Sequence, residues 1–514
     1  MTKAGDIHRR QFIRSTVAGA IGAAVNAPLG QRAFGRSSRE RPPNILLIMS
    51  DEHDSRISGC YGNPIARTPH IDHLAQTGVI FDNAYCNSPL CSPSRLSFTS
   101  GKYIHRVRAW NNAAQLPSED IASLATVMQA ANFNPFLCGK MHYDFHRRYG
   151  FVDIGPLRSN GWIKEGGGSR RNPDNLKPKK VSHRFYDFGT GEDSRVLSHD
   201  REVTKSALSF LAQRKRVESP FFMIVGYLAP HFPLIVPDKN WRHFRDQVPM
   251  PQIPDGFIDS MPLNYQLLRA GMGLQNVDDL TTKLGRELYY GLTEWIDNEI
   301  GKVLAALQKS DVNDDTIIIY TSDHGENLGE HGLWWKKTMY EQSARVPLIV
   351  SWPKRWAGGQ RRRKACSLLD LVQTIVELGG GTTPEDWDGD SMVDWLDNHE
   401  KSWKDLAVSQ YYGQSVASGY TMLRQGQYKY VYHTPPSAQH AAQRELYDLQ
   451  HDPMEFNNLA DMDPYQARVD QMHTLMVKEV GESPEITEER CRVDFSRNYH
   501  QDQNVSKAGK SISG

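Results

Sequence analysis

Residues 87–101 read Asn-Ser-Pro-Leu-Cys-Ser-Pro-Ser-Arg-Leu-Ser-Phe-Thr-Ser-Gly, and this stretch decides how the rest of the chain is interpreted. Ser92 is a typical N-cap, Pro93 fits the first helical position, and the final glycine fits the residue after a helix. The spacing therefore predicts a short helix whose N-terminus lies beside Cys91. Free backbone N–H groups there favour an anion, and Arg95 would lie one turn further along the same face. A lone cysteine in such a helix is more often a buried core residue, so the longer pattern has to decide.

The longer pattern, Cys-x-Pro-Ser-Arg from Cys91 to Arg95 followed by Thr-x-Gly, resembles the signature of the sulfatase family. In that family a maturation enzyme oxidises this cysteine to formylglycine, and the hydrated aldehyde acts as the nucleophile. The resemblance implies that Cys91 is a formylglycine precursor and that a formylglycine-generating enzyme is a partner of this chain.

Charge and cysteine content exclude several classes of protein. The 514 residues contain 60 Lys and Arg and 60 Asp and Glu, so no overall positive field favours nucleic acid. Six cysteines occur without Cys-x-x-Cys spacing, which argues against a zinc module or a dense disulfide framework. One or two disulfides remain open at this stage.

The N-terminus has the features of an export signal. Arg9 and Arg10 precede an apolar run of small residues, 16–30, which is too short and too weakly apolar to span a membrane. The segment resembles a twin-arginine signal, and we expect residues 1–35 to be this signal and its linker. The expectation includes the Tat translocase as a partner, a periplasmic or secreted location and no stable membrane insertion. An amphipathic leader or a cytosolic arm is the alternative.

Short apolar runs alternate with amphipathic segments through most of the chain, which predicts a large, mainly parallel sheet covered by helices on both faces. The strands are expected at 44–50, 136–138, 221–227, 316–321 and 347–352. The helices are expected at 68–78, 120–131, 200–215 and 284–308. The family resemblance implies the same α/β class, the alkaline-phosphatase-like fold.

The pattern changes near residue 400. Residues 428–432 and 445–449 alternate like antiparallel strands, and residues 464–480 have helical periodicity. We therefore expect a catalytic domain at 36–400 and a smaller C-terminal α+β subdomain at 401–494. The remaining residues, 495–514, are polar and are expected to form a mobile tail. A polar, glycine-rich stretch at 160–191 is expected to be a surface insertion.

Acidic side chains follow two of the expected strands, at the edge of the sheet where ligands bind in this class of fold. Asp51 and Glu52 follow the first strand, and Asp323 and His324 follow the fourth. Such oxygen-rich clusters favour Ca²⁺, with Mg²⁺ or Mn²⁺ as alternatives. The resemblance implies that Asp51, Asp323, His324 and the diol at Cys91 are metal ligands. Many sulfatases have Asp where Glu52 stands and Asn where His324 stands, so ligation by Glu52 is left open.

Basic residues in three further motifs match family positions. Lys140 and His142 lie in Gly-Lys-x-His, His231 lies in Pro-His-x-Pro, and Lys336 follows Gly-Leu-Trp-Trp. The resemblance implies that Lys140 and Lys336 bind the transferring group, that His142 orients the nucleophile and that His231 serves the leaving group. Lys337 is the alternative if the register shifts by one residue.

Together these motifs predict an enzyme that hydrolyses sulfate esters of a small molecule or glycan. Arg95 is expected to contact the ester, and His105 is expected either to face the site or to be structural. A phosphonate monoester or phosphodiester hydrolase with the same nucleophile is the first alternative. The second alternative is a non-catalytic protein that binds anions or glycans.

Overall fold

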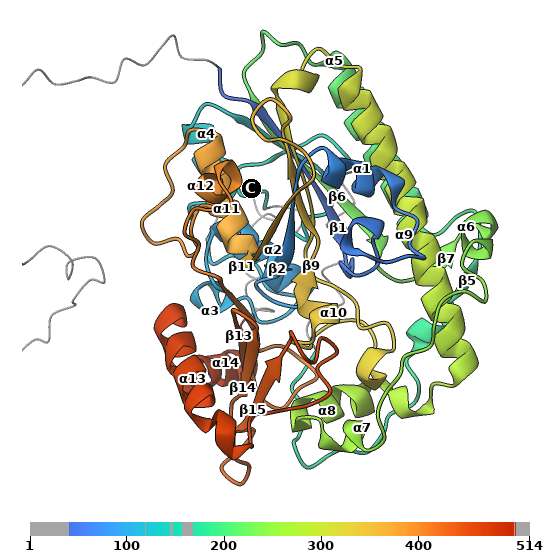
Figure 1. The fold of residues 1–514 in the computed structure, drawn as a ribbon, viewed down its shortest axis with the longest axis vertical. Coiled ribbons are helices and arrows are strands. Elements are labelled where there is room, and N and C mark those ends of the chain that lie inside the picture. The colour runs from blue at the N-terminus through green and yellow to red at the C-terminus, as the bar shows by residue number, and fades with distance from the viewer. Residues whose placement is uncertain (1–40, 119, 144–146, 157–167, 498, 500–514) are drawn as a thin grey trace, which may run out of the picture. The chain divides into compact units, whose positions relative to one another are not determined.

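The strand predicted at 44–50 is β1 (Asn44–Asp51), and it lies in the middle of the main sheet of a computed structural model (Figure 1). The other strands of this sheet are β2 (Val79–Tyr85), β3 (Asn134–Gly139), β4 (Val152–Asp153), β6 (Phe221–Pro230), β8 (Thr316–Ser322), β9 (Arg345–Val346), β10 (Leu348–Ser351) and β11 (Gln360–Ser367). Their order is β11-β2-β10-β8-β1-β6-β3-β4, and β9 pairs with β2. β1 is parallel to both of its neighbours, whereas β10 is antiparallel to both of its own. The sheet is therefore mainly parallel, as predicted.

The structure describes residues 41–514 except 119, 144–146, 157–167, 498 and 500–514. The expected export signal at 1–35, most of the expected tail and part of the expected insertion lie outside the described residues. Within the described part, no helix is both long and apolar enough to cross a membrane. The six cysteines are all described, and none forms a disulfide.

Helices cover both faces of the sheet, because β1 sends alternate apolar side chains to each side. Leu46 and Ile48 pack in a cluster with residues of one helical layer, and Ile45 and Leu47 pack in a cluster with the other. The first layer consists of α1 (Pro69–Gln76), α5 (Arg195–Gln213) and α9 (Asp279–Gln308). The second consists of α2 (Cys91–Ser100), α4 (Leu124–Ala130), α11 (Leu368–Leu378) and α12 (Val393–Asp397).

The start of α2 differs from the prediction. Leu90, in extended conformation with φ −157°, is the N-cap, and Cys91 is the first helical residue. Ser92 does not cap the helix because its N–H and its hydroxyl both donate to Asn112, at 3.1 and 3.2 Å. The correction moves Cys91 into the first turn, and Gly101 ends the helix at φ 65° as expected.

Shorter elements connect these strands and helices along the chain. The helices among them are α3 (Ile104–Val107), α6 (Asp238–Arg242), α7 (Phe257–Ser260), α8 (Leu263–Met272) and α10 (Glu341–Ala344). β5 (Gly189–Thr190), at the end of the expected insertion, pairs in parallel with β7 (Ile235–Val236). The described end of the insertion is therefore attached to the body of the protein.

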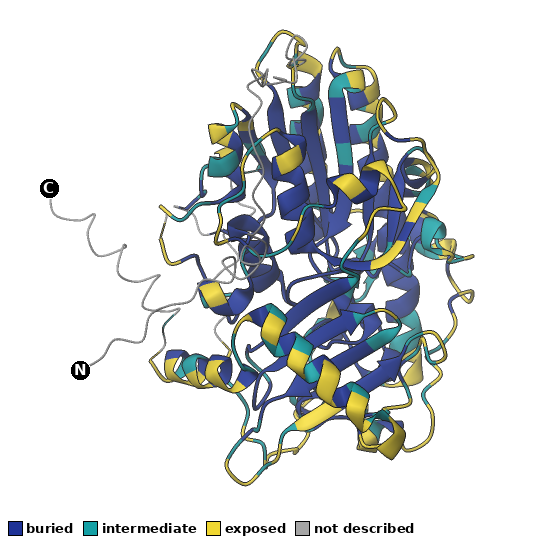
Figure 2. Cartoon of the chain, turned by 60° about the vertical axis from the view of Figure 1, so that its left-hand side comes forward, coloured by how far each residue is buried: buried dark blue, intermediate teal, exposed yellow. Residues whose placement is uncertain are grey.

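The C-terminal part contains the expected antiparallel sheet, with two strands and one helix more than predicted (Figure 1). Its strands are β12 (Leu406–Tyr411), β13 (Tyr420–Gln425), β14 (Tyr428–His433) and β15 (Gln443–Asp448), followed by α13 (Gln466–Val480) and α14 (Pro484–Ser496). The helix α14 was missed, although Ser483 caps it and Pro484 opens it. Figure 2 shows buried strands beneath helices whose outer turns are exposed.

Candidate active site

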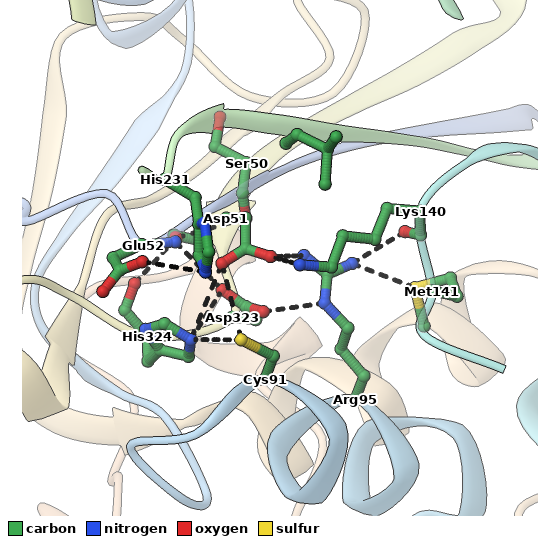
Figure 3. A network of polar contacts seen from close by, with 12 residues as sticks. Ser50, Asp51, Glu52, Cys91, Arg95, Lys140, Met141, His231, Asp323 and His324 are labelled. Atoms are coloured by element: carbon green, nitrogen blue, oxygen red, sulfur yellow. Dashed lines mark hydrogen bonds and ion pairs between the residues drawn. The ribbon is translucent and has the colours of Figure 1, made fainter. Parts of the chain in front are cut away.

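The two acidic clusters meet at the carboxyl edge of the sheet, as their positions after parallel strands predicted (Figure 3). β1 and β8 run in register to their ends, so that Ser50 lies opposite Ser322. Asp51 and Asp323 follow these serines, and the N–H of Asp323 donates to the carbonyl of Ser50 at 3.3 Å. Both carboxylates are 0% exposed. Two buried negative charges so close together require a compensating positive charge.

Asp51, Cys91, Asp323 and His324 form a group that fits a divalent cation. One potential ligand atom from each lies within 4.8 Å of the others. The Nε2 of His324 lies 3.7 Å from Asp51 Oδ1, 3.6 Å from Asp323 Oδ1 and 3.2 Å from the sulfur of Cys91. Ligands at right angles around Ca²⁺ are about 3.3–3.7 Å apart, since each lies 2.3–2.6 Å from the ion. The donor atoms, which are two carboxylate oxygens, one imidazole nitrogen and one sulfur, therefore have the spacing of a shared ion.

His324 is held in the form that a metal ligand needs. Its Nδ1 donates to the carbonyl of Gly325 at 3.0 Å, which leaves the lone pair of Nε2 facing the carboxylates. Burial is the main cause that lowers the pKa of His324 to about 3. The imidazole is therefore neutral at physiological pH.

Glu52 belongs to a second group of potential ligands, with Asp51 and His231. In the structure its Oε2 lies 2.7 Å from the Nζ of Lys336 and 3.2 Å from the Nε2 of His231. Burial, and after it the neighbouring Glu326, raise the pKa of Glu52, while Lys336 opposes the shift. Glu52 thus pairs with two groups expected to handle the substrate, and its ligation of a metal remains a prediction.

Arg95 contacts the carboxylates more closely than the sequence suggested. Its Nε donates to Asp323 at 2.7 Å, and one terminal nitrogen donates to the carbonyl of Lys140 at 2.7 Å. The other terminal nitrogen, Nη2, is 3.6 Å from Asp51 and has no hydrogen-bond acceptor among the described residues. Two of the three guanidinium nitrogens therefore position protein groups, and Nη2 remains for the predicted contact with the ester.

Lys140 and His142 both lie near this arginine. Lys140 forms an ion pair with Asp51, and burial is the main cause that lowers its pKa to about 7. His142 has a pKa well below its ordinary value because of burial and then the charges of Lys140 and Arg95. Its Nδ1 is buried and has no partner among the described residues. An unpaired buried nitrogen of this kind is available to a nucleophile or a ligand.

Cys91 sits at the point where these groups converge. Its sulfur lies 3.7 Å from Asp51 Oδ1, at the first turn of α2 (Figure 3). Burial is the main cause that raises the pKa of the thiol to about 11, opposed by Lys336. With these neighbours alone, the side chain would carry a thiol proton at neutral pH, not a thiolate.

Lys336 reaches the acidic cluster through its ion pair with Glu52, which favours it over Lys337 for the predicted role. Lys337 donates instead to the hydroxyl of Ser415 at 3.2 Å. His105 interacts with Gln410 at 3.0 Å and lies 4.0 Å from Glu482, and neither partner belongs to the acidic cluster. These contacts favour a structural role for His105.

Two neighbours of the site were not found from the sequence. Glu326 is buried beside Glu52 and accepts backbone N–H groups of Leu328 and Trp335 at 2.8 and 2.5 Å. Its position two residues after His324 could have indicated that Glu326 lies near the site. Arg184 comes from the expected insertion, where no pattern marked it.

Comparisons with known proteins agree with the geometry. A family profile described as Sulfatase matches residues 43–381, more than half of the chain, and one described as N-sulphoglucosamine sulphohydrolase, C-terminal, matches residues 329–481. The choline-sulfatase of Rhizobium meliloti (strain 1021) is 29% identical over 443 residues, which cover 82% of each protein. The arylsulfatase K of Bos taurus is 27% identical and covers 87% of this chain and 84% of the relative.

Solved structures share the fold. The phosphonate monoester hydrolase of Agrobacterium radiobacter has a TM-score of 0.71 at 23% identity, covering 85% of this chain and 95% of that structure. A structure described as bound to its substrate, D-glucosamine-2-N,6-O-disulfate, has a TM-score of 0.65 at 22% identity, covering 86% and 98%. The chain therefore belongs to the sulfatase family of sulfuric ester hydrolases and has their alkaline-phosphatase-like fold. Membership of this family of hydrolases argues against the alternative of a non-catalytic protein that binds anions or glycans.

Proposed function

We propose that the chain hydrolyses sulfate esters with a formylglycine formed from Cys91 and a divalent cation, with Ca²⁺ as the first choice. One observation carries the proposal. The sulfur of Cys91 lies within 3.7 Å of both Asp51 and His324, two residues from opposite parts of the chain. Motifs that are far apart in sequence thus converge on the residue that the family modifies.

Asp51, Asp323 and His324 would hold the cation. When bound, it supplies positive charge that stabilises the transferring oxyanion and the nucleophile. A thiol is a poor ligand for a hard cation, whereas a hydroxyl oxygen at position 91 completes an oxygen-rich set. Mg²⁺ and Mn²⁺ are the alternatives to Ca²⁺.

Formylglycine supplies two hydroxyl groups when it is hydrated, one to attack sulfur and one whose deprotonation expels sulfate. The unpaired Nδ1 of His142 is available to take a proton from these hydroxyls. Lys140, Lys336 and the Nη2 of Arg95 offer positive charge to the sulfuryl oxygens. Their carboxylate partners hold these cations in place before the substrate arrives.

His231 serves the leaving group in this scheme. Its Nδ1 donates to the carbonyl of Phe232 at 2.7 Å, which leaves Nε2 as the atom that can pass a proton to the ester oxygen. Burial and then the charges of Lys336 and Lys140 hold the pKa of His231 well below its ordinary value. Negative charge on a bound sulfate ester would offset those two cations and raise the pKa of His231.

Peptide mass spectrometry of active enzyme tests the nucleophile. Residue 91 should be lighter than an encoded cysteine and should react with hydrazide reagents. Cys91→Ala should abolish turnover and leave Asp51, Asp323 and His324 able to bind metal weakly. Fully active enzyme with an unmodified thiol at position 91 would refute the proposed mechanism.

A phosphonate monoester or phosphodiester hydrolase with the same nucleophile is the alternative, since a similar cationic site can receive either oxyanion. The solved phosphonate monoester hydrolase shares the fold at 23% identity, which does not extend its activity to this chain. Rates on an aryl sulfate and on a phenylphosphonate ester, measured with one enzyme preparation, distinguish the two. A higher kcat/KM for the phosphonate would favour the alternative.

We also propose export by the Tat translocase after maturation, on the basis of the Arg9-Arg10 pair and the apolar run that follows. Lys does not replace this arginine pair well. Changing Arg9 and Arg10 to Lys should therefore retain the protein in the cytosol of its host. An unchanged yield outside the cytosol would refute this route.

A further inference from the structure

The loop that carries Lys336 also carries a second lysine, Lys337. Its backbone is left-handed at Trp335 (φ 63°) and at Lys337 (φ 85°), which is a strained conformation for residues other than glycine. The N–H of Lys337 donates to the carbonyl of Pro89 at 3.0 Å, two residues before Cys91. The hydroxyl of Tyr420 donates to the carbonyl of Lys337. The loop is therefore held at both backbone groups of Lys337.

The ammonium of Lys337 lies among positive charges. Burial, and after it the charges of Arg184 and Lys336, lower its pKa to about 7, although Cys91 and Glu52 oppose the shift. Lys336 has the carboxylate of Glu52 as its partner. For Lys337 the described residues provide only the hydroxyl of Ser415, at 3.2 Å, and no carboxylate within ion-pair distance. A partly buried ammonium without a counter-ion is unfavourable, and a bound anion would relieve that cost.

Arg184 lies close to the histidine that we assign to the leaving group. Its guanidinium packs over the ring of Phe232, 3.9 Å from the centroid, and 5.0 Å from that of Trp335. The same Phe232 ring stacks on His231 with centroids 4.1 Å apart. One aromatic ring therefore contacts both Arg184 and the histidine assigned to the leaving group. The stacked guanidinium therefore holds a positive charge beside this ring, and that charge attracts an anion.

We propose that Lys337 and Arg184 form a subsite for a second anionic group, carried on the leaving-group part of the sulfate ester. The ligand class is an acidic saccharide whose second anion is a carboxylate or another sulfate. This inference rests on the proposed function, because His231 marks the leaving-group side. A quaternary ammonium leaving group, such as the choline in the name of one relative, would be repelled by the same two cations.

Three aryl esters of one framework test the subsite: phenyl sulfate, 3-carboxyphenyl sulfate and 3-(trimethylammonio)phenyl sulfate. Matured wild-type enzyme should prefer the carboxylate over the ammonium ester by about 10-fold or more in kcat/KM at low salt, and less at high salt. Lys337→Met should reduce this ratio about 5-fold or more, and Lys337→Arg should keep it. Lys309→Met, which removes an exposed lysine at the end of α9, is the matched control and should keep the ratio.

Arg184→Met is the second variant, in case Lys337→Met fails to fold. A wild-type ratio near one, a preference for the ammonium ester, or an unchanged ratio in both folded Met variants would overturn the subsite. Calorimetric binding of the carboxylate and ammonium esters to the Cys91→Ala protein gives a readout that needs no turnover. If no ester is hydrolysed but this binding depends on Lys337, the proposed function fails and the subsite stands. If all esters are hydrolysed without a charge preference, the proposed function stands and the subsite fails.

Discussion

Replacing Asp323 by Asn removes one buried charge at the centre of the site and keeps the shape of the side chain. Although burial alone would raise its pKa, Arg95, His324 and Lys140 hold the pKa of Asp323 well below its usual range. The carboxylate therefore stays ionised and neutralises Arg95, whose Nε is 2.7 Å away. Both side chains of this pair are at most 1% exposed.

The size of the effect follows from this burial. Removing one partner of a buried ion pair costs about 3–5 kcal/mol. Spread over the unit Pro42–Gly514, this corresponds to a decrease in Tm of roughly 3–5 °C, since each residue contributes about 2.1 cal/mol/K to the entropy of unfolding. Loss of a metal ligand should reduce kcat/KM more than the roughly 10–100-fold typical of residues that only support a ligand.

Three measurements on Asp323→Asn check the reasoning: metal content of the purified protein, kcat/KM on 4-nitrophenyl sulfate, and Tm with and without a chelator. The chelator should lower the Tm of the wild type, because a metal that binds the folded state stabilises it, and should have little effect on the variant. Correctly folded Asp323→Asn enzyme with stoichiometric metal and wild-type turnover would refute the metal assignment.

Asp297→Asn is the matched control for a buried carboxylate outside the site. Asp297 is 0% exposed and accepts the N–H groups of His70 and Ile71 at the start of α1, at 3.1 and 2.9 Å. Burial raises the pKa of Asp297 to about 7, so its carboxyl group is only partly ionised at neutral pH. Replacing it by neutral Asn therefore removes only part of a negative charge. This variant should keep its metal and its turnover whatever stability it loses.

Lys336→Ala should reduce kcat/KM by about 10²–10³-fold, or ~2.7–4 kcal/mol, for every leaving group alike, because Lys336 is assigned to the sulfuryl oxygens. A loss confined to one leaving group, in a steady-state comparison of several esters, would place it elsewhere. His231→Ala should impair alkyl or sugar sulfates more than nitrophenyl sulfate, whose anion leaves without a proton, and equal impairment would leave His231 only a binding role. Away from the site, Lys429 forms ion pairs with Glu341 and Glu455. Burial raises the pKa of Glu455 to about 7, whereas the pKa of Glu341 is lowered to about 2 because Lys429, Arg345 and Arg424 together outweigh burial. As the pH falls from about 7 to 4.5, Glu455 takes up a proton in the folded state first, so the contribution of this cluster to the free energy of unfolding should increase. Below pH 4.5, Glu341 takes up a proton in the unfolded state first, so that contribution should decrease. Urea titrations between pH 3 and 8 should show that Glu455→Gln removes the increase, and an unchanged profile would contradict the assignment.

The sheet could be predicted well because each predicted strand is marked by a short apolar run in the local sequence. Residues 44–50 are a continuous apolar run, and such a run is stable only where both faces are covered. The parallel arrangement then placed Asp51 and Asp323 at one edge before any contact was known. The reversed direction of β10 was not predictable, because its short apolar run has the same composition in either orientation.

Local signals were less reliable where a side chain has a competing partner. Ser92 and Pro93 pointed to a helix that begins at Pro93 with Ser92 as its cap, but the hydrogen bonds of Ser92 to Asn112 leave Leu90 as the cap. Such a bond joins residues 20 positions apart, and no periodicity in the sequence reports it. The described C-terminal helix α14 was missed for a different reason, since its apolar residues are too few to give a clear helical face.

The sequence alone therefore determined the family, the class of fold and the residue types of the site, because motifs and apolar runs are local properties of the chain. Only the tertiary structure showed that Arg95 is held by Asp323, 228 residues away, and that Arg184 packs over Phe232, the ring that stacks on His231. Contacts between distant segments depend on how helices and loops pack over the sheet. That packing decides which charges face the substrate and which support the groups that do.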